Sequence, residues 1–152
     1  MGNSAAKDAT EDADGSRSVD LSRKLSPADY IKHISGEHVE GDLLVLPWEI
    51  YYNTISIAEN INASFNFISE IPEELSLHVP HLRVLNMSHN QINKLPESFH
   101  LLLHLRSLDL SYNKFREFPI TITKLPKVHS VNVAHNSIIE LPISIGRMQT
   151  VS

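Results

Sequence analysis

A pattern of fifteen residues recurs four times in this chain and constrains its fold more than any other feature. The copies begin at Ala58, Leu82, Leu105 and Val128, so the period is 24 residues once and 23 residues twice. Each copy follows the order apolar-x-x-apolar-x-apolar-x-x-Asn-x-apolar-x-x-apolar-Pro. A fixed period of this size indicates a solenoid of stacked coils.

Each copy predicts a short strand followed by a turn and a compact outer segment. In the second copy Leu85 and Met87 alternate with polar or solvent-facing positions, which is the period of a β-strand. Coils stacked about 4.8 Å apart would join these strands into a parallel sheet. The segment that follows Pro96 is too short for a long helix. The predicted fold class is therefore α/β, a solenoid with a curved parallel β-sheet on its concave side and 3-10 or short helices on its convex side.

The Asn that ends each strand segment is predicted to be structural. A buried carboxamide has two donors and an acceptor, so it can bond the free backbone groups of the turn and of the adjacent coil. These residues are Asn66, Asn90, Asn113 and Asn136.

The chain divides into a tail, an entry region and the repeats. Residues 1–24 are rich in Gly, Ser, Ala and Asp and predict a disordered tail. Residues 25–57 predict a capping helix, with Ser26 as its N-cap and Pro27 in its first turn, followed by a degenerate first coil. Full repeats are assigned to 58–81, 82–104, 105–127 and 128–150, without an evident C-terminal cap. An open edge at the last strand predicts self-association, or a chain that is a shortened and inactive form of a longer repeat protein.

The phrases LRVLNMSHNQI and LPESFHLLL resemble the leucine-rich repeat superfamily in its short intracellular type. The resemblance covers about residues 41–151. It implies protein–protein binding, usually through the concave sheet, and no catalytic chemistry.

Solvent-facing positions of the strands and their turns line up into columns across the coils. Arg and aromatic residues are the usual anchors of protein interfaces, and here they flank a small polar floor. We expect a partner protein to lie across this strip, anchored by Arg83, His89, Arg106 and Tyr112. The full set assigned to the surface is Asn62, Phe65, Arg83, Val84, Asn86, Ser88, His89, Arg106, Asp109, Ser111, Tyr112, His129, Asn132 and His135. The alternative is a sheet face that is merely solvated, because repetition alone produces columns.

Charge and composition narrow the class of partner. The net charge is −5, but residues 26–81 hold one Lys against nine acids, whereas residues 82–152 hold eight Lys or Arg against four acids. Such polarity steers protein partners and is unlike the one-signed basic face of a nucleic-acid binder. The chain has no Cys, no secretory signal and no apolar run of membrane-spanning length, so we expect a cytoplasmic protein.

The first residues, MGNSAA, resemble an N-myristoylation signal with Gly2 as the acceptor, although Ala6 stands where the strict signal has Ser or Thr. Acylation of Gly2 would make the protein a membrane-proximal signalling scaffold. A single acyl chain beside the acids of this segment binds membranes only weakly. The alternative is a plain flexible start.

The sequence predicts no catalytic residue, no metal and no cofactor. His100 and His104 have the spacing of two zinc ligands on a helix, but no third ligand or general base accompanies them. Phosphate-binding loops and nucleophile elbows are also missing from the sequence. We therefore expect a binding protein and not an enzyme.

Overall fold

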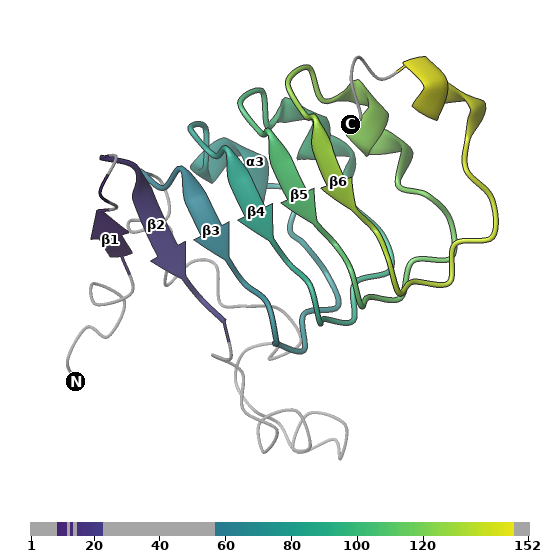
Figure 1. Ribbon diagram of the computed structural model, residues 1–152, viewed down its shortest axis with the longest axis horizontal. Helices are drawn as coiled ribbons and strands as arrows, with labels where there is room; N and C mark the ends of the chain where they lie inside the picture. The colour runs from purple at the N-terminus through teal and green to yellow at the C-terminus, as the bar shows by residue number, and fades with distance from the viewer. Residues whose placement is uncertain (1–8, 12, 14, 23–56, 148–152) are drawn as a thin grey trace.

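The computed structural model describes residues 9–11, 13, 15–22 and 57–147, which form a solenoid with one sheet (Figure 1). The strands of the sheet are β1 (Ala9–Glu11), β2 (Arg17–Asp20), β3 (Asn60–Asn62), β4 (Val84–Asn86), β5 (Ser107–Asp109) and β6 (Ser130–Asn132), in that spatial order. β1 is antiparallel to β2, and all later neighbours are parallel. The parallel solenoid that the period predicts is confirmed.

The strands pair in register, so equivalent positions of successive coils lie side by side. Ile61 of β3 pairs with Leu85 of β4, which pairs with Leu108 of β5. These three side chains point into the coil and are buried. The residues before and after them in each strand point to solvent. Because the strands are in register, these residues form columns on the solvent-facing side of the sheet.

The outer segments stack along the opposite side of the solenoid from the sheet (Figure 1). They are α3 (Leu75–His78) and the 3-10 helices η2 (Glu97–Leu101), η3 (Ile120–Lys124) and η4 (Ile143–Arg147). Pro96 and Pro119 precede η2 and η3 with φ of −64° and −68°, the values that the pyrrolidine ring imposes. The Pro96 carbonyl accepts the N–H of Phe99 at 3.1 Å and so begins the helical turn. Short helices on this side are also as predicted.

The core runs through the coils between the sheet and the outer segments. In the coil that contains β4, Leu82, Leu85, Met87, Ile92 and Phe99 are all buried. A fully buried side chain of this kind contributes about 1.5–3 kcal/mol. The apolar positions of the repeat therefore hold the solenoid together.

The disordered tail expected for residues 1–24 is wrong for residues 9–11 and 17–22. Arg17–Asp20 forms β2, and Ser18, Val19 and Asp20 pair with Asn60, Ile61 and Asn62. Val19 and Leu21 are buried in the same core as the repeats. The physical reason is that RSVDLS at 17–22 repeats the strand phrase RSLDLS at 106–111, so its apolar side chains can be buried against β3.

Other sequence predictions lie outside the described residues. They are the acylation of Gly2, the capping helix after Ser26, the degenerate first coil within 25–57 and the end of the fourth repeat after residue 147.

Candidate functional site

The solvent-facing side of the sheet, here called the sheet face, carries the residues that the sequence assigns to partner binding. One edge of this face is formed by Glu59, Arg83, Arg106 and His129, one residue from each coil, and we call these four the arginine row. The N–H groups of Arg106 and His129 donate to the carbonyls of Arg83 and Arg106 at 2.8 and 3.0 Å. The backbone thus fixes the spacing of the row from coil to coil.

Charge along the arginine row is unevenly balanced. Nη1 of Arg83 lies 2.9 Å from Oε2 of Glu59, and both side chains are partly exposed. Arg106 is exposed and forms no ion pair with any residue that the structure describes. The positive charge of this row is therefore concentrated towards β5.

The opposite edge of the sheet face is a stack of four rings, which we call the ring ladder. Its members are Phe65, His89, Tyr112 and His135. Neighbouring ring centroids lie 4.1 Å apart, and the planes deviate from parallel by 10° to 14°. Because the faces are used in stacking, the ladder presents mainly ring edges to solvent. The sequence places these residues in one column, but nothing in its pattern predicts that the rings stack.

Every member of the ring ladder has a left-handed backbone, with φ of 54° or 55°. This conformation is unfavourable for residues with a Cβ and is a genuine outlier for bulky ones such as Phe and Tyr. The turn is held by hydrogen bonds to the adjacent coil. The His89 N–H donates to the Ser111 carbonyl at 3.0 Å, and the Asn90 N–H donates to the Tyr112 carbonyl at 3.2 Å.

The central column of the sheet face stabilises local turns and also faces solvent. Its members are Asn62, Asn86, Asp109 and Asn132. Oδ1 of Asn86 accepts the N–H and the hydroxyl of Ser88 at 3.0 and 2.8 Å. Oδ1 of Asp109 accepts the same two groups of Ser111 at 2.9 and 2.6 Å. Ser88 and Ser111 are buried, so the structure does not present them to a partner as the sequence interpretation expected.

The Asn residues that follow the strands, which we call the Asn ladder, join consecutive coils. Nδ2 of Asn90 donates to the carbonyls of Ala63 in the preceding coil and of Met87 and Ser88 in its own, at 2.9 to 3.2 Å. Its Oδ1 accepts the Ile68 N–H at 3.0 Å. Asn66, Asn113 and Asn136 donate in the same way, and the carboxamide of Asn66 reaches the Leu21 carbonyl.

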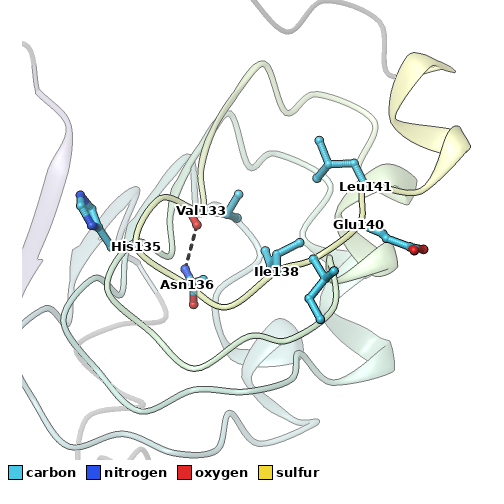
Figure 2. A pocket seen from close by; sticks show the side chains of 7 residues that line it. Val133, His135, Asn136, Ile138, Glu140 and Leu141 are labelled. Carbon is cyan, nitrogen blue, oxygen red and sulfur yellow. Dashed lines mark hydrogen bonds between the residues drawn. The ribbon is translucent and has the colours of Figure 1, made fainter.

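Two pockets among the described residues lie away from the centre of the sheet face. One of about 330 Å³ is lined by residues of the turn after β6, among them Val133, Ile138 and Leu141. Figure 2 shows the Asn136 carboxamide bonded to the Val133 carbonyl within this turn, while the imidazole of His135 points away from the apolar side chains. A second, of about 420 Å³, lies between the outer turns around Pro72 and Pro96. Neither brings together a nucleophile and a general base.

His100 and His104 each have their own protein partner. Nδ1 of His100 contacts the Glu97 carbonyl, and Nδ1 of His104 lies 3.3 Å from Nζ of Lys127. Within the described ranges there is no group of three His, Asp or Glu residues placed to hold a metal ion. No helix among the described residues is long and apolar enough to span a bilayer.

The repeat geometry and the Asn ladder together indicate the class of repeat fold to which this chain is similar. The leucine-rich repeat family profile matches residues 59–115, which cover β3 to the coil of β5. The described coils of this chain therefore have the leucine-rich repeat fold. A comparison with curated protein sequences finds no match.

Solved structures with the same fold come from different organisms. A leucine-rich repeat protein of Leptospira interrogans is 27% identical with a TM-score of 0.62, and the match covers 68% of this chain and 26% of that one. The SNF/U2A′ complex of Drosophila melanogaster matches at 17% identity and a TM-score of 0.62, over 97% of this chain and 76% of that one. The leucine-rich repeat domain of APL1B is 18% identical with a TM-score of 0.57, and the match covers 77% of this chain and 37% of that one. The chain thus spans about a quarter of the Leptospira protein, and the last two likenesses concern the fold alone.

Proposed function

We propose that this chain is a protein-interaction module, acting as an adaptor or regulatory subunit, whose partner binds across the sheet face. The observation that carries the proposal is that one strip of the face has exposed Arg106 on one side and half-exposed Tyr112 on the other. Arg and Tyr are the residue types that most often anchor interfaces. Val84, which is 39% exposed, adds an apolar contact between them.

Two further observations support the proposal. The structural neighbour from Drosophila melanogaster is a complex, SNF/U2A′, so this fold occurs in a protein assembly. The fold also fixes the outward columns through backbone hydrogen bonds, which gives a partner a preorganised surface.

The cysteine-free composition favours a cytoplasmic site for the interaction. Acylation of Gly2 remains a prediction.

Site-directed photocrosslinking tests the proposal with matched positions. A photoreactive phenylalanine analogue replaces Val84 on the sheet face or Leu77, which is 68% exposed on the outer side. We expect the Val84 position to give a discrete crosslinked species in cells and the Leu77 position to give none. The crosslinked protein is then identified by mass spectrometry and purified, and its binding is reconstituted with the full chain. A partner captured at Leu77 and not at Val84 would contradict the proposal.

We also propose self-association through β6. In this coil Leu141 is 62% exposed, whereas the equivalent residues of the two preceding coils, Leu95 and Phe118, are partly buried against the core. Sedimentation velocity over a range of concentrations tests this, with Leu141→Glu as the variant. A wild-type chain that stays monomeric at high concentration would remove this second proposal and leave the first intact.

A further inference from the structure

The inference concerns the chemistry of the partner and rests on the function proposed above. In the arginine row, the fold of the described residues pairs the charge of Arg83 but not that of Arg106. Arg83 has Glu59 as its ion-pair partner at 2.9 Å, whereas Arg106 has no such partner among the described residues. His129 is exposed next to it and uses Nδ1 to contact the Lys127 carbonyl at 3.1 Å.

Asp109, the acid of β5, already accepts hydrogen bonds from other residues. Oδ1 of Asp109 accepts two hydrogen bonds from Ser111, and its Oδ2 accepts one from Nδ2 of Asn132 at 3.2 Å. Asp109 also lies three residues along the strand from Arg106, about 10 Å away at the usual rise. Arg106 is therefore available to an anion supplied from outside the chain.

The donor type and spacing indicate which anion fits. A guanidinium binds a carboxylate through two parallel N–H groups. Adjacent strands lie about 4.8 Å apart, so the row places the side chains of Arg83, Arg106 and His129 at short, regular intervals across the sheet, and the positive charge that the described residues leave unpaired is that of Arg106. A chain with several carboxylates in succession matches this arrangement. The excess of eight Lys or Arg over four acids in residues 82–152 would attract it to this end of the solenoid.

The other edge of the strip adds a requirement for apolar residues. The ring ladder offers the edges of Phe65 and Tyr112, and Val84 is exposed between the ladder and the arginine row. A nucleic acid is disfavoured because Glu59 and Asp109 stand on the same face and would repel a continuous line of phosphates. We propose that the sheet face binds an acidic segment of a partner protein that also carries apolar residues, with Arg106 as its main anchor and Arg83 and His129 beside it.

The probe is a short fluorescein-labelled peptide of alternating Glu and Phe, measured by fluorescence anisotropy with the full chain. Its counterpart with Lys in place of Glu is the peptide control. We expect the Glu peptide to bind, its affinity to fall as salt is raised, and the Lys peptide not to bind. Arg106→Glu should weaken binding by roughly tenfold or more, and Arg106→Lys should weaken it less.

Lys124→Glu is the matched protein control, because it makes the same change of charge at an exposed position of η3 on the outer side. It should change the affinity by less than about twofold. The inference is overturned if Lys124→Glu weakens binding as much as Arg106→Glu, if Arg106→Glu has no effect, or if a single-stranded RNA binds more tightly than the Glu peptide. Circular dichroism and a thermal melt of each variant establish that it is folded.

The failure of this inference is distinguishable from failure of the proposed function. If the partner crosslinked at Val84 binds Arg106→Glu as tightly as it binds the wild type, the interaction module stands and the acidic partner does not. If Val84 crosslinks nothing, the proposed function itself fails.

Discussion

The imidazole of His89 lies flat on the phenol ring of Tyr112, with centroids 4.1 Å apart and planes 10° from parallel. Both residues have φ near +55°, a conformation that costs roughly 1–2 kcal/mol for a residue with a Cβ. Stacked aromatic pairs contribute about 0.5–1.5 kcal/mol each. The two effects are of similar size, so stacking can offset the backbone strain of this turn.

Substitutions at Tyr112 separate stacking from strain. Tyr112→Ala removes the contacts with both His89 and His135 but keeps a Cβ at positive φ, and we expect a loss of about 1–3 kcal/mol in the free energy of unfolding. Tyr112→Gly removes the same contacts and relieves the strain, so it should be more stable than the Ala variant by about 1 kcal/mol. Urea unfolding measures both. A Gly variant that is no more stable than the Ala variant would show that the backbone carries no strain here.

Asn90→Ala should destabilise the chain by about 1–3 kcal/mol, because it leaves the buried Ile68 N–H without its acceptor and removes one of the two Asn side chains that donate to the Ala63 carbonyl. Asn93→Ala is the control, since Asn93 is exposed in the same coil and should change stability by less than about 0.5 kcal/mol. Chemical denaturation of the two variants measures the free energy of unfolding of each. Equal small losses would mean that the Asn ladder does not join the coils.

Leu21→Ala tests whether the N-terminal segment belongs to the core. Leu21 is 0% exposed, and a buried Leu→Ala substitution costs about 2–5 kcal/mol. Arg17→Ala, at an exposed position of β2 in the same segment, is the control and should have little effect. If Leu21→Ala melts at the wild-type temperature, the segment that contains β2 does not contribute to the fold.

The pH dependence of stability should include a contribution from Glu73. Hydrogen bonding from the Ser98 side chain, then from the backbone N–H groups of Ser98 and Glu97, lowers the pKa of Glu73 below its ordinary value of 4.5. A carboxyl whose pKa is lowered by folding stabilises the fold above its unfolded pKa, and this contribution is lost as the pH falls through the folded pKa. The wild type should therefore lose stability relative to Glu73→Gln as the pH drops below about 4.5.

Parallel urea titrations of the wild type, Glu73→Gln and Glu74→Gln at several pH values provide the measurement. Glu74 is exposed in the same turn and serves as the control. A difference between wild type and Glu73→Gln that stays constant with pH would rule out the contribution of Glu73.

The sequence predicted the features that depend on period and missed those that depend on local geometry. Leu85 and Met87 could be assigned to the core because alternation and a 23-residue repeat fix their direction. β2 was missed because Val19 and Ile61, which pair in the sheet, are 42 positions apart, so the period is broken. The closeness of RSVDLS to RSLDLS was the available signal.

The sequence predicted which residues form the columns of the candidate site, but not the contacts that these residues make. Asn86 and Ser88 are two residues apart and were assigned to the same outward surface. The structure turns the hydroxyl of Ser88 towards Oδ1 of Asn86, because a side chain of this length satisfies the turn locally. Stacking in the ring ladder could not be predicted, since it requires the positive φ that the pattern does not encode.

The antiparallel course of β1 bears on how far any assembly of this protein could grow. β1 is three residues long, runs against β2 and carries exposed Glu11, and short charged edges resist pairing with another chain. Association through β6 would then join like edges by a two-fold axis and close on itself. The expected product is a discrete dimer, because a fibre needs two compatible edges on every subunit.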